Sequence, residues 1–477
     1  MSRVLISAAH KSSGKTTVTA GICAALRQRN LDVQTFKKGP DYIDPMWLAS
    51  ASGNACHNLD FHTMTGNEIH SVFQRYSIQK DISVIEGNKG LYDGVDLEGS
   101  NSNAALAKVL KTPVVLVIDA RGMTRGVAPL LLGYLAFDQE IEIKGVILNK
   151  LGGSRHEQKL RNIVEHYTDI PMIGAVHHDP KMEIDERHLG LIPSNESEFA
   201  NQTLDYLAQR INAQVNLDQF IEIAGTAEKQ NTTGFIQPVT TAKHSVKIGV
   251  AQDSAFGFYY QGDLEALERA GAEIVPVNTL HDSYLPELDG LIIGGGFPET
   301  QADKLEANDC LRREIKTAIE NGMPCYAECG GMMYLSRSLQ WHDKTWEMVG
   351  VIQADTVMHS RPQGRGYMRL EKNANYPWPE VVNPTEIPNT GKATNSINAH
   401  EFHYSNLQNI DPALKFAYDV KRGHGITGSQ DGIVYKNLFA SYAHQRDVST
   451  HNWAEQFVNF VANCRNRQTT PYITVAR

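Results

Sequence analysis

Short apolar runs alternate with longer stretches of helical periodicity along the first half of the chain. The apolar runs lie at residues 4–7, 32–36, 82–85, 114–118, 145–148 and 172–176, and the stretch 16–29 has the periodicity of a helix. Strands whose apolar residues follow one another continuously are buried on both faces, as in a parallel sheet covered by helices. The pattern therefore predicts an α/β fold with a parallel sheet in this half.

A second alternating set begins further along the chain. Residues 246–251 and 290–293 predict its first strands, and the segment 225–245 before them is polar and rich in turn formers. A chain of 477 residues is also long for a single hydrophobic core. We therefore expect a first domain at 1–224, a linker at 225–245, a second domain at 246–464 and a tail at 465–477.

Composition and charge narrow the class of protein. A formal net charge of −9 argues against nucleic acid or an anionic membrane as the main partner. The six cysteines lack the spacing of a disulfide framework. No apolar run approaches the roughly 20 residues that cross a bilayer, and the first apolar run is too short for a signal peptide. The sequence thus predicts a cytoplasmic protein that binds neither nucleic acid nor membrane.

A phosphate-binding loop is predicted at residues 9–16, between the first strand and the first helix. Gly14 keeps the turn open, Lys15 would pair with the β- and γ-phosphates of ATP, and Thr16 would ligate Mg²⁺. The motif departs from its usual form at Ala9, which replaces glycine, and the alternative is an ordinary polar turn capped by a serine. The strand directly before and the helix directly after favour the phosphate loop. The residues predicted to bind ATP here are Ser12, Ser13, Gly14, Lys15, Thr16 and Thr17.

Acidic residues follow two of the predicted strands, in the segments 37–45 and 86–94. Ligands of open α/β sheets bind beyond the carboxyl ends of the strands, so both segments point at one crevice. Glu86 is the best-placed Mg²⁺ ligand and Asp41 the next. Taken singly, either acid is an ordinary solvated loop residue. Together with the phosphate loop, they favour a magnesium nucleotide site.

A cysteine is predicted to lie on a sharp turn between a strand and a helix. Cys329 follows a short strand pattern at 323–327 and precedes two glycines, as in a nucleophile elbow. A thiol at a helix N-terminus is more readily ionised to the attacking thiolate. His444 follows a late strand pattern and is the candidate base. The alternative is a buried structural cysteine, a description that fits Cys325 well.

Backbone N–H groups free of side chains are needed beside such a thiol to bind an oxyanion. The glycine run at 294–296 ends a predicted strand, and another glycine directly follows the cysteine. The predicted oxyanion-hole residues are Gly295, Gly296 and Gly330.

These motifs occur together in a known family. The chain resembles the cobyrinic acid a,c-diamide synthase and cobyric acid synthase group. The resemblance is carried by residues 38–45 (Lys-Gly-Pro-Asp-Tyr-Ile-Asp-Pro), 86–94, 187–191 and 400–405, in the same order along nearly the whole chain. It implies a dethiobiotin synthetase-like ATPase domain with a P-loop, followed by a class I glutamine amidotransferase domain with a flavodoxin-like sheet.

The resemblance also implies the activity. Cys329 would hydrolyse glutamine through a thioester with His444 as base. Most class I amidotransferases have a glutamate two residues after this histidine, but Arg446 stands there, which implies a cysteine–histidine dyad. In the other domain a tetrapyrrole carboxylate would attack the γ-phosphate of ATP, and ammonia delivered inside the protein would intercept the acyl phosphate. Sequestration is needed because water would hydrolyse that intermediate.

The same resemblance assigns further residues. Asn149 matches the position at which related ATPases read adenine. The residues expected near the acidic tetrapyrrole are Tyr42, Asp44, Lys89 and Asp93, with Asp44 or Asp93 as a second metal-bound carboxylate. The implied cofactor is Mg²⁺, with ATP and glutamine as co-substrates. The sequence leaves a homodimer open.

The identity of the tetrapyrrole depends on one loop. Asn88 and Lys89 stand where the cobyrinate enzymes usually have Val-Met, so siroheme and nickel-sirohydrochlorin or sirohydrochlorin are alternatives to cobyrinate. More distant alternatives are a P-loop ATPase regulator and a dethiobiotin synthetase-like carboxylase, neither of which needs Cys329 and His444. The motif His-Glu-Phe-His at 400–403 resembles a zinc helix, but its histidines are three residues apart instead of four.

Overall fold

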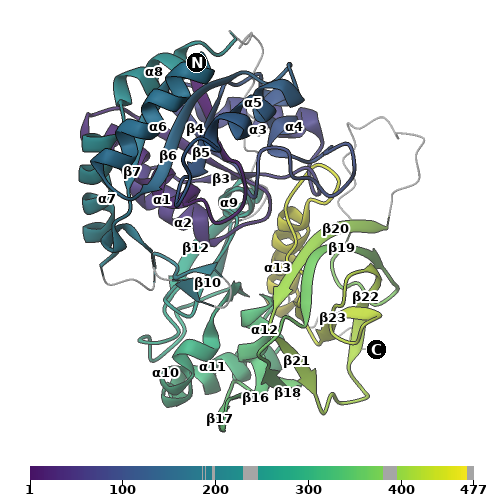
Figure 1. The fold of residues 1–477 in the computed structure, drawn as a ribbon. Coiled ribbons are helices and arrows are strands. Elements are labelled where there is room, and N and C mark those ends of the chain that lie inside the picture. The colour runs from purple at the N-terminus through teal and green to yellow at the C-terminus, as the bar shows by residue number, and fades with distance from the viewer. Residues whose placement is uncertain (185, 188–189, 196–198, 229–244, 380–394, 470–477) are drawn as a thin grey trace, which may run out of the picture. The chain divides into compact units, whose positions relative to one another are not determined.

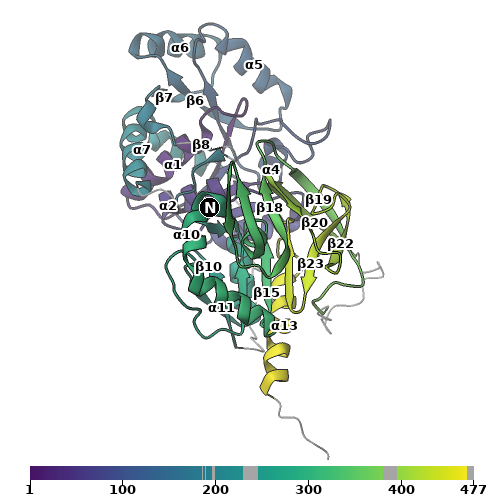
Figure 2. The ribbon, with the colours of Figure 1, turned by 90° about the horizontal axis from the view of Figure 1, so that it is seen from below.

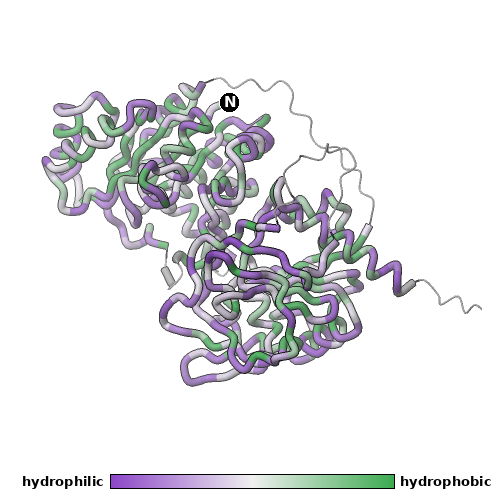
Figure 3. Tube along the Cα trace, turned by 90° about the vertical axis from the view of Figure 1, so that its right-hand side faces the viewer, coloured by the Kyte–Doolittle hydropathy of each residue, from purple (hydrophilic) through white to green (hydrophobic). Residues whose placement is uncertain are grey.

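The computed structural model describes residues 1–184, 186–187, 190–195, 199–228, 245–379 and 395–469. The chain divides into two compact units, Met1–Gln237 and Pro238–Arg477. Both units are α/β, as the sequence predicted (Figure 1). In Figure 3 apolar stretches (green) lie mainly in the interior of each unit, and polar stretches (purple) are common on the outer turns.

The described part of the first unit contains a seven-stranded parallel sheet with the order β3-β2-β4-β1-β5-β6-β7. This confirms the predicted parallel sheet. The short strand β3 was not among the predicted strands. The strands are β1 (Ser2–Ala8), β2 (Val33–Lys38), β3 (His57–Leu59), β4 (Ile82–Glu86), β5 (Val114–Asp119), β6 (Ile143–Leu151) and β7 (Met172–His177). A separate two-stranded ribbon pairs β8 (Glu186–Arg187) with β9 (Gly190–Leu191).

Helices cover this sheet because alternate strand residues are apolar on each face. Val4, Ile6 and Val84 share one core with apolar residues of α1, α2, α7 and α8. The helices are α1 (Lys15–Gln28), α2 (Ile43–Ser52), α3 (Gly66–Ser77), α4 (Asn103–Leu110), α5 (Val127–Phe137), α6 (Ser154–Tyr167), α7 (Ala200–Gln214) and α8 (Leu217–Gly225), with the 3₁₀ turn η1 (Pro180–Met182). Since β1 lies between β4 and β5, the carboxyl ends of β2, β4 and β1 are neighbours.

Within its described residues the second unit contains a nine-stranded mixed sheet with the order β12-β10-β13-β15-β24-β23-β22-β19-β20. The first five strands are parallel, and the remaining pairs are antiparallel. The strands are β10 (Val246–Ala251), β12 (Ala272–Val277), β13 (Gly290–Ile293), β15 (Cys325–Glu328), β19 (Gly364–Lys372), β20 (Ser396–His403), β22 (Lys415–Arg422), β23 (Gln430–Tyr435) and β24 (Leu438–Ser441). The antiparallel half was not predicted.

Smaller elements complete the second unit. A four-stranded sheet in the described chain joins β17 (Lys344–Glu347), β16 (Ser336–Trp341), β18 (Ile352–Met358) and β21 (Ser405–Gln408). A short ribbon pairs β11 (Phe256–Phe258) with β14 (Gly295–Gly296). The helices are α9 (Gln261–Ala270), η2 (Pro298–Gln301), α10 (Ala302–Ala307), α11 (Asp309–Glu320), α12 (Gly330–Leu335) and α13 (Trp453–Thr469).

The predicted domain boundaries can be compared with the ends of the observed helices and with the described residues. Helix α8 ends at Gly225, where the predicted linker begins, and residues 229–244 of that linker lie outside the described residues. Helix α13 runs to Thr469, past the predicted domain end at Cys464 (Figure 2). Residues 470–477 of the predicted tail, and 188–189 of the motif at 187–191, also lie outside the described residues. In the described part of the chain, no helix is long and apolar enough to span a membrane.

A fully buried arginine fastens β1 to two other segments. The Nε of Arg3 donates to the carbonyl of Leu110 at 2.9 Å, and its Nη2 donates to the carbonyls of Lys111 at 2.9 Å and Glu228 at 2.7 Å. These carbonyls lie at the end of α4 and beyond α8. A buried guanidinium is tolerated only with such partners, so Arg3 ties the end of the first unit to its central strand.

Replacing Arg3 by alanine should therefore destabilise the first unit by about 2–4 kcal/mol, because several carbonyls lose a charged donor inside the protein. Urea denaturation combined with hydrogen exchange in β1 and β5 measures this. The matched control is Arg29→Ala, which removes an exposed ion pair with Asp218 and should cost at most about 1 kcal/mol. Equal effects of the two substitutions would contradict the anchoring role of Arg3.

Candidate functional site

The predicted phosphate loop connects β1 to α1 and has the backbone of a tight anion-binding turn. Gly14 is in the left-handed region with φ 79°, and a Cβ there would lie 2.4 Å from Nδ2 of Asn149. That Nδ2 donates to the carbonyl of Ser13 at 2.9 Å, so Asn149 clamps the loop from β6. The hydroxyl of Ser13 donates to the carbonyl of His10 at 2.7 Å, so this side chain shapes the loop.

A cavity of about 760 Å³ opens beside this loop. Six of the predicted ATP residues line it: Ser12, Gly14, Lys15, Thr16, Thr17 and Asn149. Of the predicted magnesium and substrate residues, Asp41, Asp44, Glu86 and Lys89 also line it. Ser13, Tyr42 and Asp93 are not part of the cavity wall. The structure thus brings most of the predicted first site together around one space.

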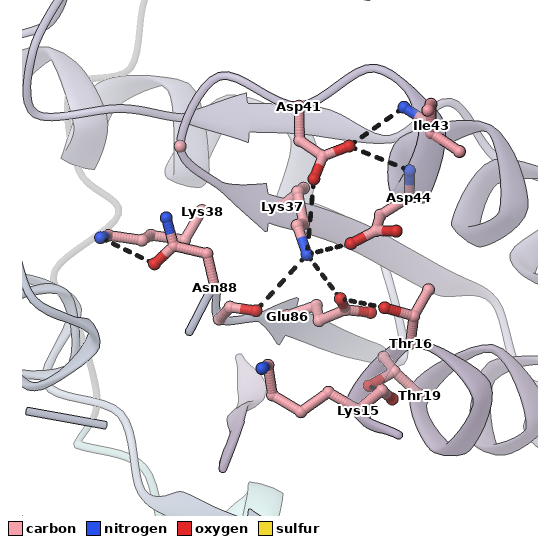
Figure 4. A network of polar contacts seen from close by, with 12 residues as sticks. Lys15, Thr16, Thr19, Lys37, Lys38, Asp41, Ile43, Asp44, Glu86 and Asn88 are labelled. Atoms are coloured by element: carbon pink, nitrogen blue, oxygen red, sulfur yellow. Dashed lines mark hydrogen bonds and ion pairs between the residues drawn. The ribbon is translucent and has the colours of Figure 1, made fainter. Parts of the chain in front are cut away.

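A buried lysine that the sequence analysis missed lies at the centre of the acidic residues (Figure 4). The Nζ of Lys37 is 2.5 Å from a carboxylate oxygen of Asp44, 2.5 Å from Oε1 of Glu86 and 3.9 Å from Asp41. Pairing of β2 with β4 sets Lys37 opposite Glu86. The hydroxyl of Thr16 donates to the same Oε1 of Glu86 at 2.9 Å. The available signal was a lysine at the end of a strand that is buried throughout.

The charges of this cluster oppose one another. Burial raises the pKa of Glu86, and burial together with the Lys37 ammonium lowers the pKa of Lys15 to about 8. Burial alone would lower the pKa of Lys37, but Asp44 and Glu86 outweigh it and raise that pKa. The charges in this buried cluster therefore depend on one another. Binding of an anionic ligand or a cation would strongly shift the pKa values of its members.

The residues fit a magnesium ion shared with phosphates. Among the described residues, the buried Oε2 of Glu86 has no hydrogen-bond donor, so it is an open acceptor. Asp41 is less available than predicted, because its Oδ1 accepts the N–H groups of Ile43 and Asp44 at 3.0 Å and so holds the start of α2. The described chain has no group of three His, Cys, Asp or Glu ready to hold a metal. A Mg²⁺ ion would thus need nucleotide oxygens beside Thr16, Glu86 and Asp44 or Asp41.

The loop at 88–93 is held by its own polar contacts. Asn103 donates to the carbonyls of Asn88 and Gly90, while the carbonyl of Lys89 accepts Nζ of Lys15 at 2.8 Å. Asp93 accepts the N–H of Gly90 at 2.8 Å, so its carboxylate shapes the turn. Lys89 itself has φ 42° and lines the cavity. Lys15 of the phosphate loop is therefore hydrogen-bonded to the loop of Asn88 and Lys89, where the sequence departs from that of the family it resembles.

The second site lies between β15 and α12. Cys329 has φ 47° and ψ −103°, a strained elbow that confirms the predicted strand–turn–helix arrangement. Its N–H donates to the carbonyl of Ser441 at 2.8 Å. A Cβ on Gly331 would lie 2.0 Å from the carbonyl oxygen of Ile293, so the turn requires glycine there.

His444 is held beside this thiol by two strands. It follows β24, which pairs in parallel with β15, and its N–H donates to the carbonyl of His400 on β20 at 2.8 Å. The rings of His400 and His444 stack with centroids 4.9 Å apart. Burial alone would lower the pKa of His444, but its hydrogen bonds to Cys329 and Glu328 and their charges raise it to about 10. His444 is therefore placed to exchange a proton with Cys329.

A carboxylate that was not predicted faces the same histidine. Oε2 of Glu328 lies 3.3 Å from Nδ1 of His444. At the position two residues after His444, the guanidinium of Arg446 lies over the ring of Tyr260 at 4.8 Å. The implied cysteine–histidine dyad therefore has an acidic neighbour after all, contributed by the residue directly before the cysteine. The adjacency of Glu and Cys in the sequence was the only signal.

The predicted oxyanion-hole glycines lie close to these groups. A Cβ on Gly295 would be 2.7 Å from Cε1 of His444, and a Cβ on Gly330 would be 3.0 Å from the backbone nitrogen of Gly296. The backbones of the three glycines thus approach the histidine and the elbow as closely as the absence of side chains allows.

The His-Glu-Phe-His segment lies on a strand, β20, and not on a helix. Residues three apart on a strand point to opposite faces, so His400 and His403 do not converge. His400 stacks on His444, while His403 stacks on Tyr442 with centroids 3.7 Å apart. The rejection of a zinc helix is confirmed.

Comparisons with known proteins cover both units. Residues 5–192 match the CobQ/CobB/MinD/ParA nucleotide binding domain, and residues 247–448 match the CobB/CobQ-like glutamine amidotransferase domain. A protein of Magnetococcus marinus named cobyrinate a,c-diamide synthase is 42% identical, covering 96% of this chain and 97% of that protein. Proteins with the same name from Methanosarcina acetivorans and Methanosarcina barkeri are 40% and 39% identical, covering 97% and 98% of this chain and 96% and 98% of theirs.

Replacing Gly295 by alanine should push the ring of His444 away from the thiol. We expect the alkylation of Cys329 by iodoacetamide at pH 7 to slow by about 10- to 100-fold, since a displacement of about 1 Å breaks such a pair. Peptide mass spectrometry follows the rate, with the exposed Cys310 as an internal reference. Gly262→Ala is the matched control, because a Cβ there meets nothing within 4 Å. An unchanged Cys329 rate in the Gly295 variant would contradict this packing.

Proposed function

Because the chain belongs to the cobyrinate a,c-diamide synthase family, we propose that its two units carry out one ATP- and glutamine-dependent amidation of tetrapyrrole carboxylates. The observation that carries the proposal is the presence of two candidate sites in one chain: the phosphate-loop cavity with its buried acids, and the Cys329–His444 pair at a strained elbow. Either site alone is found in many kinds of enzyme.

In the second unit, Cys329 attacks the side-chain amide of glutamine. His444 takes the thiol proton and returns it to the departing nitrogen, so that a thioester forms as ammonia leaves. Gly295, Gly296 and Gly330 supply backbone close to the developing oxyanion. Water then hydrolyses the thioester to glutamate.

In the first unit, Lys15 and the phosphate loop hold the phosphates of ATP, with Thr16, Ser12 and Thr17 at the cavity wall. A Mg²⁺ ion at Thr16, Glu86 and Asp44 or Asp41 would neutralise the charge on the phosphates. Lys37 places a second ammonium among the acids, where a phosphoryl group crosses to the substrate carboxylate. Asn149 is the proposed adenine contact as well as a clamp on the loop.

The acyl phosphate formed in this way reacts with the ammonia released from glutamine. Both species are lost in bulk water, the first by hydrolysis and the second by protonation, so transfer inside the protein is part of the proposal. We place the reaction in the cytoplasm, where ATP and glutamine are present. Association of two copies stays a prediction.

The proposed substrate is cobyrinate, the acid named for the relatives. Siroheme and sirohydrochlorin, with or without nickel, are the second candidates, and the observation in their favour is the loop of Asn88 and Lys89. The amide of Asn88 accepts Nζ of Lys38 at 3.0 Å, and Lys89 lines the cavity, so both residues are placed to select an acidic ligand. Mass analysis of products from cobyrinate, sirohydrochlorin and siroheme separates these candidates.

The substitution Cys329→Ala tests the two-site proposal. Amidation with glutamine should fall by at least about 1,000-fold, whereas amidation with ammonium salts should stay near the wild-type rate, because only the thiol step is removed. Cys325→Ala, four residues earlier on β15, is the matched control and should retain both activities. Loss of amidation with both nitrogen sources, in a variant that is still folded, would count against the proposal.

A further inference from the structure

We infer that Glu328 is the third member of the thiol site: a positioning residue that orients His444 and stabilises its charged form. The inference rests on the proposed glutamine hydrolysis and adds a residue to it. It replaces the cysteine–histidine dyad by a Cys329–His444–Glu328 triad whose acid comes from the nucleophile's own strand.

The carboxylate of Glu328 is fixed in one orientation. It is buried, and its Oε1 accepts the N–H of Gln445 at 2.9 Å and the hydroxyl of Tyr326. These two donors occupy one carboxylate oxygen, which leaves Oε2 to face Nδ1 of His444 at 3.3 Å. Because Nδ1 faces the acid, the other ring nitrogen is the one available to take the thiol proton.

A chain of buried hydrogen bonds supports this orientation. Nε2 of Gln445 donates to the hydroxyl of Tyr326 at 2.7 Å. Its Oε1 accepts the hydroxyl of Tyr418 at 2.8 Å and Nε2 of His451 at 2.6 Å. Burial lowers the pKa of His451 to about 3, so that imidazole is neutral and adds no positive charge beside the acid. A network with every member satisfied holds Glu328 rigidly behind His444.

The location of the acid follows from strand pairing. Strands β15 and β24 are parallel, and Glu328 pairs with Ser441, three residues before His444. A side chain at the end of β15 can therefore reach a ring carried just past the end of β24. The position usually reserved for the acid holds Arg446, whose charge faces Tyr260 and Asp263 instead. The acid thus lies at the end of β15 instead of just past the end of β24.

Other described groups also face His444. They include Cys329 on the elbow, which favours the charged form of His444 as well, and the stacked ring of His400 on β20, whose Nδ1 meets the hydroxyl of Tyr260 at 3.3 Å. Glu328 is thus the carboxylate that hydrogen-bonds to His444 and favours the imidazolium when the thiol proton is transferred.

The test compares Glu328→Gln and Glu328→Asp with the wild-type full chain. For Glu328→Gln we expect kcat for glutamine hydrolysis to fall by about 100-fold or more with KM changed less than about threefold, because orientation and charge act on the chemical step. The alkaline limb of the pH profile should move to lower pH by more than about one unit, since His444 loses the carboxylate that favours its protonated form. Glu328→Asp should recover part of kcat.

Two controls make the outcome decisive. Asp263→Asn changes another buried carboxyl of the same unit, one that accepts the backbone N–H of Asp447 and the indole N–H of Trp453, and it should keep kcat within about threefold. Amidation with ammonium salts should be unaffected in all variants. A Glu328→Gln enzyme with unchanged kcat and an unchanged pH profile would overturn the inference, as would an equal loss in Asp263→Asn.

The rate of Cys329 alkylation separates failure of this inference from failure of the proposed function. If the wild-type protein hydrolysed no glutamine, the proposed function would fail, but alkylation would still report the state of the thiol. A slower alkylation at pH 7 in Glu328→Gln than in Asp263→Asn supports the positioning role. Equal alkylation rates in the two variants contradict it.

Discussion

Parallel strands that end side by side are the constraint on which both sites depend. In the first unit, pairing of β2 with β4 sets Lys37 opposite Glu86, and β1 delivers the phosphate loop next to them. In the second unit, pairing of β15 with β24 sets Glu328 opposite Ser441 and brings Cys329 to His444. Residues far apart in the sequence meet because the carboxyl ends of neighbouring strands share one edge.

This arrangement buries charges that must be compensated locally. The first site offsets three carboxylates with the ammonium of Lys37, and the second offsets Glu328 with His444 and two further donors. A buried ion pair stabilises the fold little by itself. Removal of one partner is nevertheless destabilising, because the remaining buried charge is then uncompensated. We therefore expect ligands to act strongly on both sites, because a phosphate, a metal ion or a thiolate changes the balance of charge directly.

The sequence predicted the features that have a periodic or spaced signal and missed those that depend on tertiary contacts. The parallel strands, the phosphate loop and the elbow at Cys329 were predictable because apolar runs and glycines recur at fixed offsets. Lys37 and Glu328 were not, since a single charged residue at a strand end has no pattern of its own and acquires its role from the neighbouring strand. The antiparallel strands were also missed, because the direction of strand pairing depends on contacts between segments far apart in the sequence. Asp41 was predicted as the second metal ligand after Glu86, but its hydrogen bonds to the start of α2 became visible only in the fold.

We propose that nitrogen passes from glutamine to the tetrapyrrole without mixing with ammonia in solution. Amidation with glutamine labelled with ¹⁵N at the side-chain amide, in the presence of an excess of unlabelled ammonium, tests it most directly by mass spectrometry of the product. We expect product amides that carry ¹⁵N in nearly every molecule. Amides that carry mostly unlabelled nitrogen would contradict it.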